Sequence, residues 1–183
     1  DLVLCESYVT CRASLLGEPD PGVGVAGLAV FEATVRCAEY EAGRSKCGRT
    51  GLLAARDEST IDSLSAALTK VGTVRVGTVA TMLLDAVASA DGAGRPLFSA
   101  LRDQPVPAGA VGRLWRACEL IREHRGDSNV AVCVAAGLSP VAMNILTELW
   151  VGMPIATYSA SRFWSAPTIE ATCDDLRSRG WLD

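Results

Sequence analysis

The stretch SPVAMNILTELWVGMPIATYSASRFWSAPTIEATCDDLRSRGWLD, residues 139–183, decides the fold. Ser139 can cap a helix and the proline after it suits the first helical position, so a helix is predicted over 141–151. A second serine, followed closely by another proline, predicts a helix over 166–179, which Gly180 ends. Glycine and proline interrupt the residues in between. The C-terminal segment is therefore expected to contain two helices joined by an irregular connection.

The second of these helices is amphipathic. Ile169, Cys173 and Leu176 recur at helical spacing and are expected to form its inner face. Beyond Gly180, Trp181 is expected to start an extended piece. The exit LRSRGWLD resembles the end of the recognition helix in a winged helix-turn-helix domain, where a leucine, a charged pair and a glycine lead into the first wing strand. A winged-helix-like module is therefore expected at the C-terminus.

The residues before this module also read as helices. A two-sided helix is predicted over 110–125, with Gly126 as its end. Asp127 or Ser128 is then expected to cap a short, buried apolar helix over 130–136. The residues expected on the buried face of the longer helix are Val111, Leu114, Trp115, Cys118 and Ile121. Trp115 and Trp150 are both expected to pack in the core.

Further upstream the pattern weakens. Helices are predicted over 58–71, 73–90 and 97–103. A fainter helical pattern covers 25–41, and loop signals cover 16–24 and 41–51. The expected fold class is mainly α, a helical domain with a C-terminal helix-turn-helix module. The expected division is a poorly defined N-terminal segment (1–58), a helical segment (59–108) and a helix-turn-helix-like helical module (109–183).

Composition indicates a globular protein without a large basic surface. Hydrophobic residues make up 49% of the 183 residues and charged residues 21%, as in ordinary globular domains. The net charge of −4 argues against the broad electrostatic footprint of a nucleic-acid-binding protein. Within 110–183, seven arginines stand against eight acidic residues. Any DNA binding must therefore rely on a local patch.

A longer stretch carries a family resemblance. GRPLFSALRDQPVPAGAVGRLWRACELIREHRGDSNVAVCVAAGLSP, followed by LTELWVGMP and RFWS, is similar to the actinobacterial SalK-like helix-turn-helix family. The similarity spans about 61–183, and its most specific block is 114–137. The resemblance implies a mostly helical protein with a helix-turn-helix domain and a regulatory role.

The chain departs from that family in three places. Members often read H-R-G-D-x-H, whereas this chain has Asn129 where the second histidine would stand. The chain ends at Asp183, where the resemblance leads us to expect a wing and a further helix. The first 58 residues do not resemble the usual start of the family. A truncated or altered member is therefore expected.

The helix over 166–179 is the candidate reading helix. The residues predicted to contact DNA are Arg162, Thr168, Thr172, Arg177 and Arg179. Glu170, Asp174 and Asp175 lie on the same helix, and their charges would repel phosphates. On charge alone, a solvated helix face is the alternative interpretation of these residues.

A second candidate site surrounds the only histidine. His124 lies next to Glu123 and three residues before Asp127, which makes this the one cluster with acid/base potential. A ligand-binding or enzymatic pocket near His124 is thus a second hypothesis. The alternative is the polar end of a helix. No nucleophile can be paired with His124, so no catalytic residue is assigned and a non-enzymatic protein is favoured.

The remaining signals are mostly negative. The seven cysteines lack the close pairs of a zinc site, so they are interpreted as reduced, buried thiols of a cytoplasmic protein. No metal or cofactor is expected. No apolar run approaches the length of a membrane span, so no membrane partner is expected. The apolar composition permits a homo-oligomer. Three functions therefore stay open: a DNA-binding regulator, a small-molecule-binding protein or enzyme, and a protein-association module.

Overall fold

The structure is a computed structural model that describes residues 2–46 and 48–183, and over these residues it is helical with no strand. The mainly α fold class is confirmed. The elements in order are α1 (Leu2–Ala13), the 3-10 helix η1 (Ser14–Leu16), α2 (Pro21–Leu28), α3 (Ala33–Arg44), α4 (Arg49–Ala67), α5 (Thr73–Ala88), α6 (Pro96–Arg102), α7 (Gly109–Ala135), α8 (Pro140–Trp150), α9 (Thr157–Ala160) and α10 (Ala166–Ser178).

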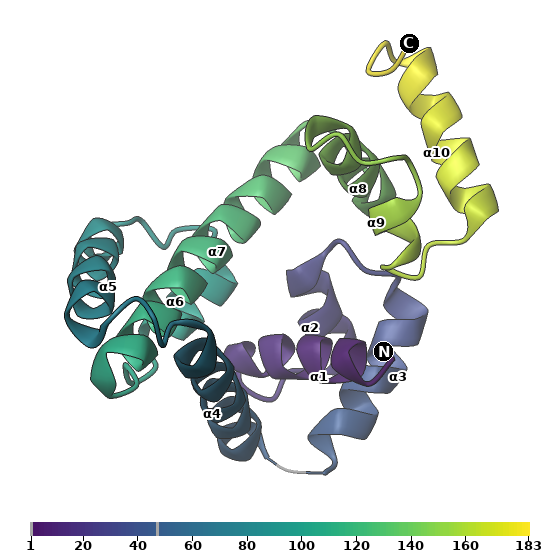
Figure 1. Ribbon diagram of the computed structural model, residues 1–183. Helices are drawn as coiled ribbons and strands as arrows, with labels where there is room; N and C mark the ends of the chain where they lie inside the picture. The colour runs from purple at the N-terminus through teal and green to yellow at the C-terminus, as the bar shows by residue number, and fades with distance from the viewer. Residues whose placement is uncertain (1, 47) are drawn as a thin grey trace.

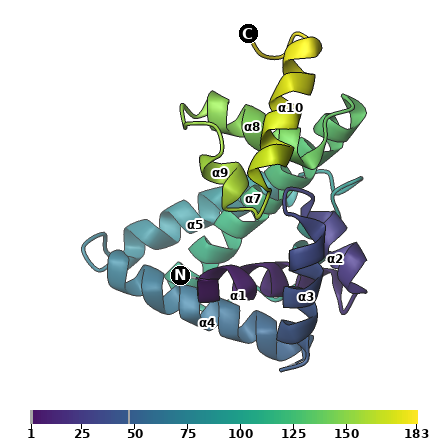
Figure 2. The ribbon, with the colours of Figure 1, turned by 90° about the vertical axis from the view of Figure 1, so that its right-hand side faces the viewer.

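Helix α7 is the axis of the molecule. Figure 1 shows it running diagonally from the side of α5 and α6 to the end where α8 and α10 lie. Helices α4, α5 and α6 pack against it, while α1, α2 and α3 pack on one another. Turned by 90°, the molecule shows α1 to α4 at one end and α8 to α10 at the other (Figure 2). The long helix thus joins two groups of helices.

Each group has its own apolar core. The first core contains the buried residues Val9, Leu15, Val25, Leu28, Phe31, Val87, Leu97, Phe98, Leu101 and Leu120. The second contains Leu138, Val141, Ala142, Ile145, Ile169, Cys173 and Leu176. Side chains from the first 31 residues therefore share one core with α5, α6 and α7. The division into three segments stays a prediction.

The helices over 73–90, 97–103, 141–151 and 166–179 are confirmed as α5, α6, α8 and α10. Ser139 caps α8 by accepting from the backbone N–H of Ala142 at 3.2 Å. Gly137 (φ +65°) and Gly180 (φ +71°) follow α7 and α10 in the left-handed conformation that favours glycine. Local capping signals therefore predicted these ends.

The expected helix end at Gly126 is wrong. Helix α7 is continuous over 27 residues, and Gly126 lies in its interior. Asp127 does not cap a following helix, because its carboxylate accepts from the backbone N–H of Phe98, at 2.9 Å, in the first turn of α6. Ser128 donates its hydroxyl to the carbonyl oxygen of His124 at 2.7 Å. The polar residues that suggested a new helix are engaged in other contacts.

The expected buried face of α7 is also wrong. Cys118 and Ile121 are exposed, and the predicted buried helix over 130–136 exposes Val132 and Val134. Trp150, expected in the core, is 83% exposed. The residues of α7 that are buried are Gly112, Arg116, Ala117, Glu119, Leu120, Glu123 and Asp127. The buried carboxylates of Glu119 and Glu123 pair with Arg56 of α4 and Arg12 of α1.

The N-terminal pattern was predicted too coarsely. The helical pattern over 25–41 is split between α2 and α3, because Ala29 takes a left-handed φ of +54°. The expected loop over 41–51 is largely helical, because α3 extends to Arg44 and α4 begins at Arg49. The guanidinium of Arg49 donates to the carbonyl oxygens of Ser14 (2.9 Å) and Leu15 (3.2 Å). This tertiary contact anchors the start of α4 on η1.

Among the described residues no single helix is long and apolar enough to span a membrane. Only α7 and α8 taken together reach that length and composition, and they meet at a bend of 116°.

The continuity of α7 can be tested at Gly126. A Cβ added there meets nothing within 4 Å, so Gly126→Ala is expected to stabilise the fold by about 0.5–1 kcal/mol by reducing the entropy of the unfolded chain. Gly137→Ala is the control, because alanine in the left-handed conformation costs about 1–2 kcal/mol. Urea denaturation measures both. Destabilisation by Gly126→Ala would show that the helix breaks at this residue.

Candidate functional site

The end of α7, α8 and α10 form a three-helix unit around the second core. Helices α7 and α8 meet at 116° across a short turn that contains Gly137, so α8 turns away from the direction of α7. Residues 141–145 of α8 are buried, so this helix does not present a reading face. Helix α10 buries Ile169, Cys173 and Leu176 as predicted. Its opposite side is exposed.

Thr168 and Thr172 lie on the side of α10 that does not face the core. The Oγ of Ser165, the cap of this helix, lies 2.8 Å from the Oγ1 of Thr168 and accepts from its backbone N–H at 3.3 Å. Thr172 donates its hydroxyl to the carbonyl oxygen of Thr168 at 2.7 Å. Both threonines line an open surface groove of about 510 Å³, together with Ser139 and Asp175. This half of the exposed face holds hydroxyl groups.

The arginines at the other end of α10 are already paired. Arg177 contacts Asp174 at 2.8 Å, and Arg179 contacts Asp175 at 3.3 Å. Arg179 also donates to the carbonyl oxygens of Ala136 (3.2 Å) and Gly137 (3.1 Å). Arg179 therefore holds α10 against the turn between α7 and α8. Part of its positive charge is neutralised by these contacts within the protein.

Arg162 lies apart from this face. Its guanidinium stacks on the rings of Tyr158 and Phe31, at 4.1 and 4.8 Å from their centroids. Its carbonyl oxygen accepts from the backbone N–H of Glu32 at 3.0 Å. The structure thus places Arg162 between the three-helix unit and the N-terminal helices, away from Thr168 and Thr172.

Glu148 is a buried carboxylate that the sequence did not indicate. Its side chain is fully enclosed, and its oxygens accept from the backbone N–H groups of Ala156 (3.1 Å), Tyr158 (2.5 Å) and Ser159 (2.6 Å). A carboxylate that accepts several backbone N–H groups at a helix start stabilises that start. Glu148 therefore fixes α9 and the connection that leads to α10.

The three residues of the histidine cluster have separate environments. The half-buried His124 packs edge-on against the ring of Phe98, with centroids 5.0 Å apart. Glu123 is fully enclosed. Asp127 lines a hollow of about 130 Å³, whose lining includes neither His124 nor Glu123. Burial raises the pKa of Asp127, although its hydrogen bond from Phe98 opposes the change. The structure does not gather the three side chains in one pocket.

Glu123 belongs to a chain of ion pairs along α7. Arg12 of α1 donates from Nε to its Oε1 (3.0 Å) and from Nη2 to its Oε2 (2.5 Å). Arg122 reaches the same Oε1 at 2.7 Å. Burial alone would raise the pKa of Glu123, but the attraction of Arg12 and Arg122 outweighs it, so the pKa is lowered. This residue is a charged anchor between α1 and α7.

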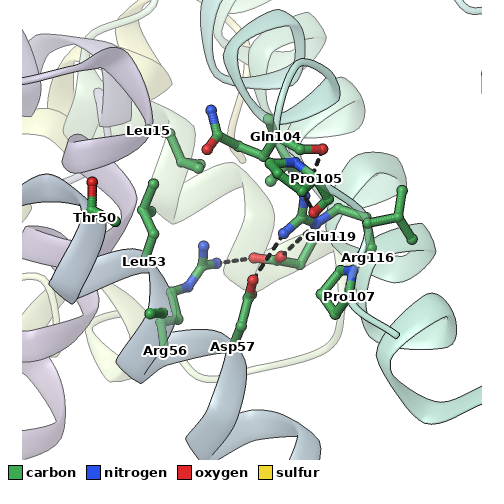
Figure 3. Close-up of a pocket in the computed structure, with 13 residues that line it drawn as sticks. Leu15, Thr50, Leu53, Arg56, Asp57, Gln104, Pro105, Pro107, Arg116 and Glu119 are labelled. Carbon is green, nitrogen blue, oxygen red and sulfur yellow. Dashed lines mark hydrogen bonds and ion pairs between the residues drawn. The ribbon is translucent and has the colours of Figure 1, made fainter. Parts of the chain in front are cut away.

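Glu119 continues the chain of ion pairs one turn earlier. Its carboxylate contacts Arg56 of α4 and lies 3.5 Å from Arg116 (Figure 3). Arg122 lies 3.6 Å away. Arg116 in turn pairs with Asp57 of α4 at 3.0 Å. Burial, the largest influence, raises the pKa of Glu119 despite the nearby arginines. Ion pairs thus join α4 and α7.

The described residues provide little support for metal binding or thiol chemistry. In the described part of the chain no three His, Cys, Asp or Glu residues are grouped to hold a metal ion. Among the five cysteines whose burial is described, Cys173 is buried, Cys118 is exposed and the other three are half-buried. The expectation of buried thiols is therefore wrong for most of these five. The residues Cys5 and Cys47 lie outside the described side chains.

A family model described as a helix-turn-helix family matches residues 3–183. The chain belongs to this helix-turn-helix family. No curated protein and no solved structure matches it. The matched range includes residues 3–58, although the first 58 residues were expected to differ from the family. The N-terminal helices that pack on α7 are therefore part of what defines this helix-turn-helix chain.

Proposed function

We propose that this helix-turn-helix protein is a cytoplasmic DNA-binding regulator of the SalK-like kind, with α10 as the recognition helix of a winged-helix-like module. The observation that carries the proposal is that α10 is held by its buried apolar stripe while its outer face is left exposed, within a chain whose family is helix-turn-helix. A rigid helix with a free face is what major-groove reading requires.

The N-terminal half of α10 is the proposed contact surface. In helix-turn-helix proteins the first residues of the recognition helix reach the base edges, and here they include Thr168 and Thr172. Arg177 and Arg179 are proposed to contact phosphates after exchanging their acidic partners. Arg162, whose guanidinium stacks on Tyr158 and Phe31, is not included in this surface. The acidic residues of α10 reduce the electrostatic part of the affinity, so binding should be weaker and less dependent on salt than in basic domains.

Thr172→Glu tests the proposed surface. Thr78→Glu is a matched control, because each threonine donates its hydroxyl to a carbonyl oxygen four residues earlier in a helix. A carboxylate facing the phosphates should weaken binding to a DNA duplex by about tenfold or more, measured by fluorescence anisotropy at about 50 mM salt. The control should bind like the wild type. Equal binding by both variants would place the DNA elsewhere or nowhere.

Self-association is a second candidate function, and the tip of α8 favours it. Trp150 is 83% exposed. Other large hydrophobic residues exposed in the same segment are Leu149, Val151, Met153 and Ile155. These five neighbouring residues are called the α8-tip patch. Exposed apolar patches mark interaction sites in soluble proteins, and tryptophan is enriched at interface centres. The proposed partner is a second copy of the chain.

Sedimentation velocity over a range of protein concentrations tests this candidate. The wild type is expected to show a dimer whose fraction rises with concentration, and Trp150→Ser should shift it toward the monomer by about tenfold or more in dissociation constant. Trp181→Ser is the control, because Trp181 is 48% exposed but lies outside the α8-tip patch. A wild type that stays monomeric at all concentrations would rule the candidate out.

A further inference from the structure

A hollow of about 300 Å³ opens between η1, α4 and the connection from α6 to α7 (Figure 3). Leu15 and Leu53 form one wall, and Leu101 and Val106 contribute from the other elements. Its size lies at the lower limit of known small-molecule sites, which are mostly apolar with a few fixed polar groups. This hollow is separate from the groove on α10 and from the surroundings of His124.

Arg56 is the polar group at the floor of the hollow. Its side chain is only 11% exposed, and its Nη2 contacts the carboxylate of Glu119. The guanidinium also lies over the ring of Trp115, 5.3 Å from the centroid. Among the described residues no other acceptor engages its remaining nitrogens, and Figure 3 shows the guanidinium turned toward the space below Leu53. Arg56 therefore has hydrogen-bond donors to offer inside an apolar enclosure.

The acidic residues at the floor of the hollow already have partners within the protein. Asp57 accepts from Trp115 Nε1 at 2.8 Å and from Arg116 Nη2 at 3.0 Å, through different oxygens. Glu119 is shared among Arg56, Arg116 and Arg122. The ion-paired network as a whole contains the arginines Arg12, Arg56, Arg116 and Arg122 and the acids Asp57, Glu119 and Glu123. It therefore carries one more positive than negative charge.

Arg122 is 34% exposed to water, whereas Arg56, at 11%, faces the apolar hollow, so an anion that enters there would pair with the more enclosed of these charges. We propose that the hollow binds a small organic acid, whose carboxylate pairs with Arg56 and whose apolar body lies against Leu15, Leu53 and Leu101. Arginine is suited to this contact, because its planar guanidinium matches the two oxygens of a carboxylate. The apolar walls exclude inorganic anions and polyanions as the preferred ligands. The inference does not depend on DNA binding.

Titration calorimetry of the full chain with benzoate and with isovalerate tests the proposal. At least one of these acids is expected to bind the wild type at millimolar concentration or below. Benzamide, which has the shape of benzoate without its charge, should bind about tenfold or more weakly, because it lacks the charge-assisted contact. Failure of both acids to bind, or equal binding of benzamide, would overturn the proposal.

Two variants locate the site. Arg56→Gln should weaken acid binding by about tenfold or more. Because this change breaks an ion pair, Val106→Trp is the second variant: Val106 is 50% exposed at the rim, so the larger side chain blocks the hollow without altering the charges. Val74→Trp, at a residue 86% exposed on α5, is its control and should bind like the wild type. Unchanged binding by Val106→Trp would contradict the assignment.

Discussion

Glu123→Ala is expected to destabilise the fold by about 3–5 kcal/mol, because it leaves a buried arginine without its partner. The carboxylate of Glu123 is fully enclosed and the side chain of Arg12 is 10% exposed. Two hydrogen bonds join these groups across 111 residues of sequence. The phenol oxygen of Tyr8 also accepts from Arg12, at 2.9 Å, but carries no compensating charge. Urea denaturation of wild type and variant measures the loss.

Two further variants separate the buried charge from the loss of packing. Arg12→Met combined with Glu123→Leu removes both charges and is expected to recover most of the stability, since apolar replacements of buried ion pairs are often neutral. Glu170→Ala removes an exposed acid from α10 and should change stability by less than about 0.5 kcal/mol. A Glu123→Ala loss below about 1 kcal/mol would show that Arg12 and Glu123 are not buried together.

The pH dependence of this contribution has a defined sign. The pKa of Glu123 is lowered in the folded protein from an ordinary value of 4.5, so its carboxylate stabilises the fold above that value. The contribution is lost as the pH falls through the lowered pKa. The difference in stability between wild type and Glu123→Gln should therefore be constant near neutrality and shrink in acid.

Leu176→Ala is expected to destabilise the helix-turn-helix unit by about 3–5 kcal/mol, because it opens a cavity in a small core. Leu176 is fully buried and packs with residues of α8 such as Ile145, which is also fully buried. Among the described helices, α10 makes its main contacts with α8. Urea denaturation measures the loss of stability. Hydrogen exchange of the backbone amides shows whether α8 and α10 are the helices that lose protection.

Leu149→Ala is the matched control, because the same side chain is deleted at a residue that is 42% exposed. It should cost less than about 1 kcal/mol. If Leu176→Ala costs no more than Leu149→Ala, α10 does not pack on α8 through its apolar stripe. If the amides of α10 keep their protection while those of α1 lose theirs, the two cores are not separate.

The helices that local signals predicted are those whose ends depend on local chemistry. A serine cap, a proline in the first turn and a glycine after the last turn define α8 and α10 by contacts within a few residues. Gly126 was also expected to end a helix, yet α7 continues through it. A tertiary contact explains this case, because Asp127, directly after Gly126, accepts from the start of α6 and does not cap a new helix.

The candidate sites were predictable to different degrees. The exposed face of α10 follows from its apolar stripe, so Thr168 and Thr172 could be placed from the sequence alone. The stacking of Arg162 and the carbonyl contacts of Arg179 depend on distant segments. The buried charges of α7 could not be predicted, because a helix with many arginines and glutamates ordinarily presents them to solvent. Only the positions of α1 and α4 reveal that Glu119 and Glu123 are enclosed.

The most direct test of DNA binding by this helix-turn-helix protein is an equilibrium titration of the wild type with duplex DNA at several salt concentrations. Binding at about 50 mM salt is expected, with log K falling linearly with log salt concentration by about 0.9 per phosphate contacted. Because Arg177 and Arg179 have acidic partners, the slope should correspond to only a few phosphates. No binding at low salt, or binding that Thr172→Glu leaves unchanged, would contradict the proposed function.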